Sequence, residues 1–231
     1  MREIVLDTET TGLEPSQGHR MVEIGCIELV NRIPTGNTFH RYLNPERDVP
    51  LGAFDVHGLS LDFLKDKPLF AKIADDLIAY LGDDPLIAHN ASFDLGFLNA
   101  ELERAARPLV ARDRVVDTLL LARRRNPGGP NGLDHLCQRY GVDNSRRTKH
   151  GALLDAELLA EVYVELIGAR QANLGLAEAN NAVVESRGAH TTIRVRPVPL
   201  APRITDAERD AHRNFVATLG EQNIWRDYRE T

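Results

Sequence analysis

The sequence has few cysteines, no long hydrophobic run and no excess of basic residues, and each absence excludes a class of protein. Its two cysteines, Cys26 and Cys137, form neither a C-x-x-C pair nor a disulfide framework, which fits a reducing compartment and packing roles. No apolar run approaches the roughly 18 residues that a membrane-spanning helix needs. The first residues, "MREIVLDTET", contain only a three-residue apolar segment, too short for a secretory signal. We therefore predict a cytoplasmic protein without a membrane partner.

The net charge is −6, from 28 Lys and Arg against 34 Asp and Glu, so the chain lacks the strongly basic surface of proteins that coat nucleic acid. An enzyme that grips only a few nucleotides needs positive charge only locally. Basic clusters at 123–125 ("RRR") and 146–149 ("RRTK") can provide it, although such clusters are more often solvated surface. The charge balance therefore leaves nucleic acid open as a substrate.

Hydrophobic periodicity predicts one α/β domain at residues 1–170. Strand-like stretches occupy 2–6, 21–30 and 37–43, and the turn-rich segment 31–36 favours an antiparallel meander. Further strands at 85–89 and 114–118 alternate with helices, which are expected at 67–82, 92–104, 131–139 and 151–168. Antiparallel strands followed by strand–helix alternation indicate a mixed sheet with helices on its faces.

The character of the sequence changes beyond residue 170. Residues 171–203 have no sustained period and carry several prolines near their end, which is typical of a linker. Residues 204–231 contain a new helix signal, because Thr205 and Glu208 form a capping box and Gly220 provides a stop. The chain's only tryptophan, Trp225, follows. We predict a linker and a short C-terminal helical segment.

Two acids, Asp7 and Glu9, stand at the end of the first strand, in "IVLDTETTG". Side chains on a strand alternate, so the two carboxylates share a face while Thr8 points away. A divalent cation between them would cancel their repulsion, since Mg²⁺ and Mn²⁺ take oxygen ligands. A strand end emerging into solvent would produce the same pair. This pattern alone does not decide between a cation site and ordinary surface.

Two later segments place further acids at element ends. In "HNASFD", residues 89–94, Asp94 falls in a first helical turn, where the helix dipole favours an acid in any case. In "HGALLDAELLAEVYVEL", residues 150–166, Asp155 shares a helical stripe with Leu159 and other apolar residues, and a carboxylate facing the core needs a compensating partner. His150 lies just upstream of this helix. Together these residues favour one shared site over several unrelated surface positions.

In this order and spacing, "DTETTG", "HNASFD" and the pair His150–Asp155 resemble the three motifs of the DEDDh group of 3′–5′ exonucleases. The resemblance covers residues 1 to about 170 and implies a ribonuclease H-like fold. Within the group, "FHRYLNP", "FDVHGLS" and "HNASFDLGF" look closest to the epsilon family of proofreading subunits of bacterial DNA polymerase III. Where that family often carries an acid five residues before the histidine of "VHG", this chain has Gly52, which removes one possible contact to the terminal sugar.

The resemblance implies hydrolysis of a single-stranded or frayed DNA 3′ end with two divalent cations, Mg²⁺ or Mn²⁺. It implies that Asp7 bridges the cations, that Glu9 and Asp155 complete the nucleophile side, and that Asp94 acts on the other ion. His150 is the implied general base, a role that suits an imidazole near neutral pH. The implied substrate-binding residues are Asp7, Thr8, Glu9, Thr10, His57, Asn90 and Asp155. His57 is also compatible with an ordinary turn residue.

The tail resembles partner-binding segments of the same family. "QANLGL", residues 171–176, resembles the glutamine-leucine motif that engages the sliding clamp, with Gln171, Leu174 and Leu176 as its contacts. The segment with Trp225 resembles the part that binds the polymerase III alpha subunit, although a helix folding back on its own domain would look the same. Two alternatives stay open: an RNA-trimming exonuclease of the DEDDh group, and a non-catalytic clamp–polymerase adaptor, which the intact acids and histidine disfavour.

Overall fold

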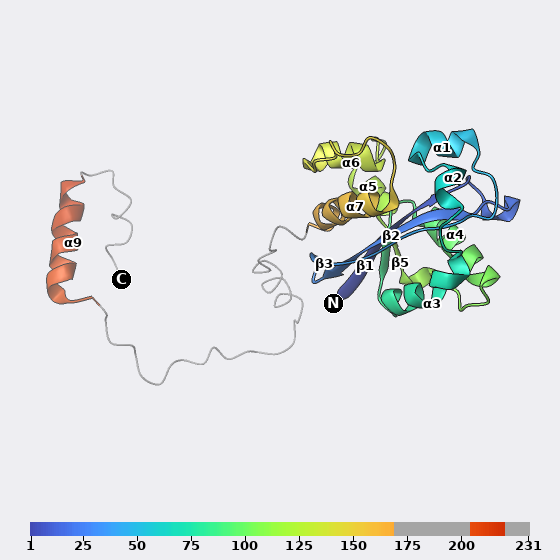
Figure 1. Cartoon of the computed structure of the whole chain (residues 1–231). Helices are drawn as coiled ribbons and strands as arrows, with labels where there is room; N and C mark the ends of the chain where they lie inside the picture. The colour runs from blue at the N-terminus through green and yellow to red at the C-terminus, as the bar shows by residue number, and fades with distance from the viewer. Residues whose placement is uncertain (169–203, 220–231) are drawn as a thin grey trace, which may run out of the picture. The chain divides into compact units, whose positions relative to one another are not determined.

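The computed structural model describes residues 1–168 and 204–219, which fall in two separate units of the chain (Figure 1). In chain order the first stretch contains β1 (Arg2–Thr10), η1 (Pro15–Gln17), β2 (Met21–Val30), β3 (Ile33–Tyr42), α1 (Leu51–His57), α2 (Leu61–Leu64), α3 (Phe70–Leu81), β4 (Leu86–Ala88), α4 (Ala91–Arg104), η2 (Arg112–Arg114), β5 (Val115–Asp117), α5 (Thr118–Arg125), α6 (Leu133–Tyr140) and α7 (Ala152–Leu166). The second stretch contains α9 (Asp206–Thr218). Among these described helices, none has the length and apolar character to cross a bilayer.

The five strands form one mixed sheet in the order β3-β2-β1-β4-β5. Strands β1, β2 and β3 are antiparallel neighbours, whereas β4 is parallel to β1 and β5 is parallel to β4. This confirms the predicted fold class, a meander extended by parallel strands with helices on both faces. The parallel part brings the carboxyl ends of β1 and β4 to the same edge of the sheet.

The hairpin between β2 and β3 is tighter than the sequence suggested. We expected a turn over residues 31–36, but only Asn31 and Arg32 leave the ladder, and Val30 pairs with Ile33. Both turn residues have positive φ, 52° and 69°, which suits the right-handed twist of a two-residue hairpin. Turn-forming residues at 34–37 therefore lie inside β3, on an exposed edge strand where they are tolerated.

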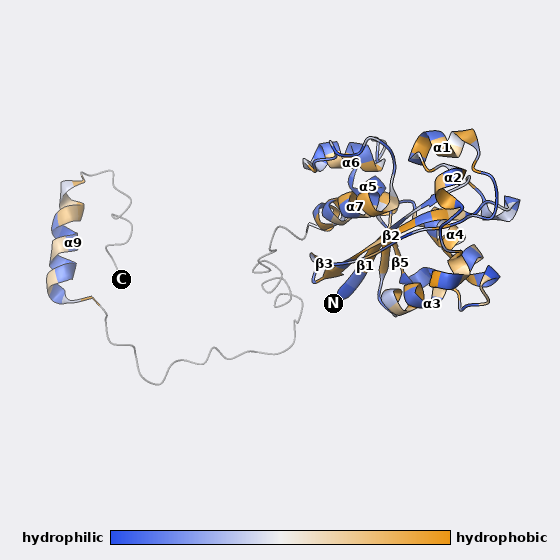
Figure 2. Ribbon diagram, in the orientation of Figure 1, coloured by the Kyte–Doolittle hydropathy of each residue, from blue (hydrophilic) through white to orange (hydrophobic). Residues whose placement is uncertain are grey.

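Each face of the sheet has its own helical cover. Ile4 and Leu6 of β1 pack in a core with α3 and α4, while Val5, between them, packs against α7. Figure 2 shows apolar residues along the central strands between these layers. Because side chains alternate along β1, Asp7 and Glu9 continue the face of α7, and Thr8 continues the face of α4.

Helix α7 lies close against the sheet at Gly25 of β2, the residue paired with Asp7. A Cβ on Gly25 would lie 2.3 Å from the backbone nitrogen of Leu153, so only glycine admits the helix here. This contact brings the first turn of α7, which carries Asp155, over the end of β1.

Three α-helices, α1, α2 and α5, were not predicted. Leu51 and Val56 of α1 are exposed, so the segment shows no apolar stripe. The local end signals are nevertheless present: Pro50 precedes the helix, and Gly58 ends it with φ 73°. Helix α1 matters because it carries His57, its one buried residue.

The predicted capping box begins α9. The Thr205 hydroxyl accepts a hydrogen bond from the backbone of Glu208, and the Thr205 backbone donates to the Glu208 carboxylate at 2.8 Å. The helix ends at Thr218, and Phe215 on it is 61% exposed. The predicted domain boundaries at residues 170 and 203 border the range 169–203, which lies outside the described residues.

Candidate active site

A cleft of about 370 Å³ at the end of β1 brings the predicted acids together. Asp7, Glu9, Asp94, Asp155 and His150 all line it. Asp7 and Glu9 come from β1, Asp94 from the first turn of α4 and Asp155 from the first turn of α7. Elements that are far apart in sequence therefore converge on one place, as the order of the motifs predicted.

The acids reach the strand end from opposite faces of the sheet. On the α7 face, ligand atoms of Glu9, His150 and Asp155 all lie within 4.8 Å of one another. On the α4 face, the buried carboxylate of Asp94 accepts a 2.7 Å hydrogen bond from the Thr8 hydroxyl. Asp7 lies on the same face of β1 as Glu9, and the charges of Asp94, Glu9 and Asp155 all act on its carboxylate. The cleft thus has two neighbouring acidic sides.

Crowding and burial make most of these acids hard to ionise. Burial, followed by the charge of Asp155, raises the pKa of Glu9 to about 8. Burial raises the pKa of Asp94 to about 7, although the Thr8 hydrogen bond opposes the shift. Burial and the charges of Asp94 and Glu9 raise the pKa of Asp7 well above its ordinary value. A bound cation would favour the ionised forms that the protein alone disfavours.

Asp155 behaves differently from the other three acids. It is 2% exposed, and burial alone would raise its pKa, but hydrogen bonds from His150 and Arg147 lower it below the ordinary value. The Arg147 guanidinium grips both Asp155 oxygens, at 2.6 and 2.7 Å. The sequence stripe had shown that Asp155 needs a partner. It did not show that Arg147, inside the basic cluster 146–149, is that partner.

Thr8 and Thr10 of the first motif were both expected to bind the substrate in one pocket, but they line neighbouring cavities. Thr8 lines the acidic cleft, whereas Thr10 lies with His57 in a second cavity of about 610 Å³ that shares Glu9 with the first. A register shift between Glu9 and Thr10 accompanies the change, and the Thr10 hydroxyl turns back to the Gly12 carbonyl at 2.6 Å.

His57 is buried beside this second cavity. Its Nδ1 accepts a hydrogen bond from the Leu59 backbone at 3.0 Å, which leaves the proton on Nε2. Among the described residues Nε2 meets no partner at hydrogen-bonding geometry, although the Thr10 backbone lies near it. Burial lowers the pKa of His57, so it is a neutral donor at physiological pH.

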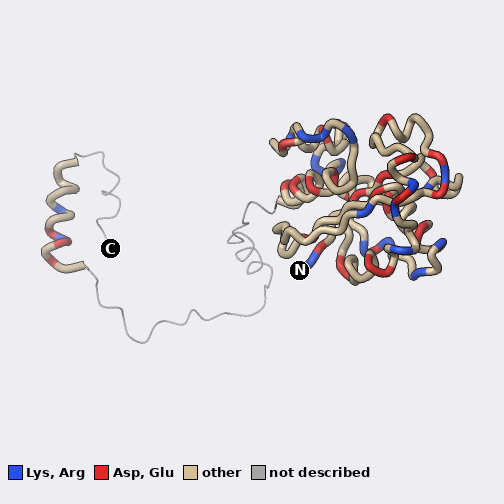
Figure 3. Tube along the Cα trace, viewed as in Figure 1, with Lys and Arg blue, Asp and Glu red and all other residues tan. Residues whose placement is uncertain are grey.

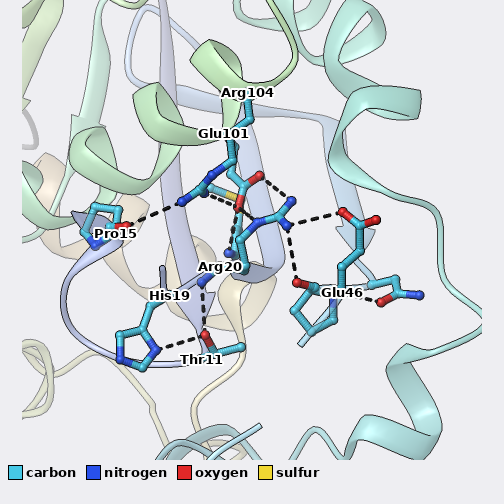
Figure 4. Close-up of polar contacts among 10 residues, drawn as sticks. Thr11, Pro15, His19, Arg20, Glu46, Glu101 and Arg104 are labelled. Carbon is cyan, nitrogen blue, oxygen red and sulfur yellow. Dashed lines mark hydrogen bonds and ion pairs between the residues drawn. The ribbon is translucent and has the colours of Figure 1, made fainter. Parts of the chain in front are cut away.

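The loop from Thr11 to Arg20 forms another wall of the second cavity, and a buried ion-pair network holds it (Figure 4). Arg20 donates to both oxygens of Glu101 on α4, at 2.7 and 2.9 Å, and the Glu101 side chain is 1% exposed. Arg104 reaches the same carboxylate at 3.2 Å. Figure 4 shows Arg20 between Glu101 and Glu46, so the loop is tied to the core through this arginine.

The structure does not bring every predicted residue into the site. Asn90 precedes α4 with φ 64°, its side chain caps no helix, and it is absent from the lining of both cavities. The predicted partner residues Gln171, Leu174, Leu176 and Trp225 lie outside the described residues. Conversely, His89, Asp134, His135 and Arg147 line the acidic cleft without having been predicted.

Comparison with known proteins fixes the class. The exonuclease family model matches residues 4–163. The chain is also similar to the solved structure of exonuclease X in complex with 5′ overhanging duplex DNA, with 25% identity, TM-score 0.56, and coverage of 72% of this chain and 92% of that one. It shares the fold of a DEDDh nuclease domain solved with bound rAMP, with 18% identity, TM-score 0.62, and coverage of 73% and 92%. Fold and site together define a 3′–5′ exonuclease.

Curated relatives narrow the class further. The DNA polymerase III subunit epsilon of Rickettsia felis is 49% identical over 229 residues, covering 95% of this chain and 97% of the relative. The subunit of the same name from Escherichia coli K12 is 42% identical, covering 97% of each chain. The chain belongs to the DNA polymerase III epsilon family, as its motifs predicted. The wider exonuclease family uses divalent metal ions.

Proposed function

We propose that this chain removes mispaired nucleotides from DNA 3′ ends as the proofreading subunit of a DNA polymerase III, with Mg²⁺ or Mn²⁺ in its acidic cleft. The observation that carries the proposal is the meeting of four acids and a histidine in one cleft. The names of the epsilon relatives favour a replicative DNA substrate over RNA.

The acids fit a divalent cation. Three potential ligand residues, Glu9, His150 and Asp155, present atoms within 4.8 Å of one another. Burial, and then the charges of neighbouring carboxylates, raise the pKa values of Glu9 and Asp7, and a bound cation would oppose both effects. Asp7, Glu9 and Asp155 would hold a cation on one side, and Asp94 would serve a second cation on the other. Cations bound there would make water a stronger nucleophile and neutralise charge on the leaving oxygen.

We assign His150 the role of general base. Its side chain is 47% exposed at the rim of the cleft, with Nδ1 3.3 Å from Asp155. In the proposed reaction its imidazole accepts the proton of the water that attacks phosphorus. The bond from phosphorus to the 3′ oxygen of the preceding nucleotide then breaks, releasing a nucleoside monophosphate and a shortened strand.

The second cavity provides a place for the terminal nucleotide. It adjoins the acidic cleft through Glu9, and Thr10 and the neutral donor His57 line it. A nucleotide seated there would present its phosphate to the acids. Proofreading follows because a mispaired end separates from its template at lower free energy than a paired end.

The central experiment measures removal of nucleotides from 3′-labelled single-stranded DNA and RNA with Mg²⁺. We expect the wild type to shorten DNA, and His150→Ala to turn over about 10²-fold more slowly, the usual effect of losing a general base, while circular dichroism shows a folded protein. Asp7→Ala should be inactive. Preference for RNA would favour an RNA-trimming enzyme, and inactivity of the wild type would favour an adaptor. A fully active, folded His150→Ala protein would contradict the assigned role.

The proposed partners are the sliding clamp, through residues 171–176, and the polymerase III alpha subunit, through residues 204–231. The exposed Phe215 of α9 and the sequence around Trp225 supply apolar contacts, and a linker raises the effective concentration of the tethered exonuclease. Pull-down with purified clamp should weaken for Gln171→Ala, and pull-down with alpha should weaken for Trp225→Ala. Unchanged recovery of either partner would refute that contact.

A further inference from the structure

Arg147 lines the acidic cleft and lies on the loop between α6 and α7. Its side chain is only 8% exposed. Besides the two hydrogen bonds to Asp155, its Nη1 donates to Asp134 at 2.7 Å, and its Nη2 lies 2.7 Å from Nδ1 and 3.4 Å from Nε2 of His150. One guanidinium thus contacts the proposed general base and a proposed metal ligand together.

The guanidinium and a metal ion need the same oxygen atoms. Both Asp155 oxygens accept hydrogen bonds from Arg147, and Asp155 also belongs to the group with Glu9 and His150 that could hold a cation. A divalent ion beside Asp155 would be repelled by the arginine charge a few ångströms away, in a setting where water screens poorly. At least one of the two arginine hydrogen bonds must therefore weaken when the ion binds.

Asp134 offers the guanidinium an alternative partner. It lies in the first turn of α6, its side chain is 56% exposed, and it already accepts one Arg147 hydrogen bond. Arginine has a planar group with five donors, so it can keep this bond while it gives up others. The arginine does not need to leave the cleft to release Asp155.

We propose that Arg147 is an exchangeable internal counter-ion: it pairs with Asp155 while no metal is bound, and it yields Asp155 to the entering cation while holding Asp134. This inference rests on the proposed metal site. It makes Arg147 a residue that sets the affinity for the metal ion. If Arg147 instead held Asp155 in position for the ion, the arginine would make metal binding tighter, and removing it would weaken binding.

The test is calorimetric titration of the full chain with Mn²⁺, without DNA. Arg147→Gln should bind Mn²⁺ at least tenfold more tightly than the wild type, because the competing charge is gone. The matched control is Arg146→Gln, which removes the same charge from an adjacent side chain that is 73% exposed; its affinity should stay within twofold. Equal or weaker Mn²⁺ binding by folded Arg147→Gln would overturn the proposal.

A second variant, Asp134→Asn, tests the same proposal if Arg147→Gln does not fold. Asp134→Asn changes an exposed side chain and removes the alternative partner, so Arg147 should stay on Asp155 and Mn²⁺ should bind several-fold more weakly. Unchanged binding would count against the exchange.

Asp155→Asn distinguishes failure of the proposed metal site from failure of the proposed counter-ion role of Arg147. If the wild type binds no Mn²⁺, or binds it independently of Asp155, the metal site itself is wrong. If binding requires Asp155 but Arg147→Gln does not strengthen it, only the counter-ion proposal fails.

Discussion

Without metal, the folded protein should lose stability as the pH rises from 7 to 9, because buried acids with raised pKa values, among them Asp7 and Glu9, must ionise. The pKa of Glu9 is raised to about 8 in the folded chain. The native state therefore keeps a proton that the unfolded state has already lost, and this advantage disappears as the pH rises through the folded pKa. Most proteins stabilised by paired carboxylates show the opposite slope at lower pH.

The magnitude follows from the pKa values. Titrating Glu9 through a pKa of about 8 between pH 7 and 9 should remove about 1.4 kcal/mol of unfolding free energy. Asp94, with a pKa of about 7, is already half ionised at the start and adds about 0.4 kcal/mol. Buried Cys26, whose pKa is raised, contributes with the same sign, because unfolded thiols ionise near pH 8.5. The diagnostic quantity is therefore the difference between wild type and Glu9→Gln.

The assay is urea denaturation in a chelator at pH 7, 8 and 9. The wild type should lose about 1.4 kcal/mol more than Glu9→Gln over this range. Saturating Mn²⁺ should stabilise the wild type more at pH 9 than at pH 7, because protons no longer compete for the ligands. Parallel pH profiles for wild type and Glu9→Gln in the chelator would refute the assignment of a protonated Glu9.

Two further predictions concern the surroundings of the site, both measured by urea denaturation. Thr8→Val leaves the buried Asp94 carboxylate without its 2.7 Å donor, so the unfolding free energy should fall by about 2 kcal/mol at pH 9 and by less at pH 6, where Asp94 is protonated; an equal fall at both pH values would point to packing instead. Glu101→Ala leaves Arg20 without its buried partner and should lower the unfolding free energy by about 3 kcal/mol. The control Glu46→Ala, whose carboxylate is 51% exposed, should lower it by less than about 1 kcal/mol, and equal losses would contradict a dominant Glu101 contact.

The sequence alone predicted the strands of the sheet and the acids of the site, because both follow from the short periodicity of side chains on strands and helices. Alternation along β1 placed Asp7 and Glu9 on one face, and the helical stripe through Leu159 marked Asp155 as a carboxylate facing the core. The structure leaves Leu159 fully buried and Asp155 2% exposed. A charged residue at an apolar position of a helix strongly indicates a functional or paired site, because burying an unpaired carboxylate is energetically unfavourable.

The partner of that carboxylate could not be predicted, because loops have no period. Within "RRTK", Arg146 is 73% exposed and Arg147 8% exposed, yet nothing in the sequence separates the two neighbours. Helix α1 was not predicted for a related reason: its apolar residues are exposed, so the sequence shows no buried apolar stripe there. The placement of His57 in the second cavity then depends on a helix that only the fold discloses.

The repulsion among the acids of the cleft is reduced in two different ways. Asp155 is held ionised by a guanidinium, whereas Glu9 and Asp94 are favoured in their protonated forms, as their opposite pKa shifts show. A metal ion must therefore displace an arginine on one ligand and protons on others. Raising the pH assists the second exchange but leaves the first unchanged, because arginine does not titrate in this range. If Arg147 acts as proposed, metal affinity should rise with pH in both wild type and Arg147→Gln, with a nearly constant ratio between the two proteins. A ratio that vanished at high pH would mean that protons, and not the arginine, are the competitors.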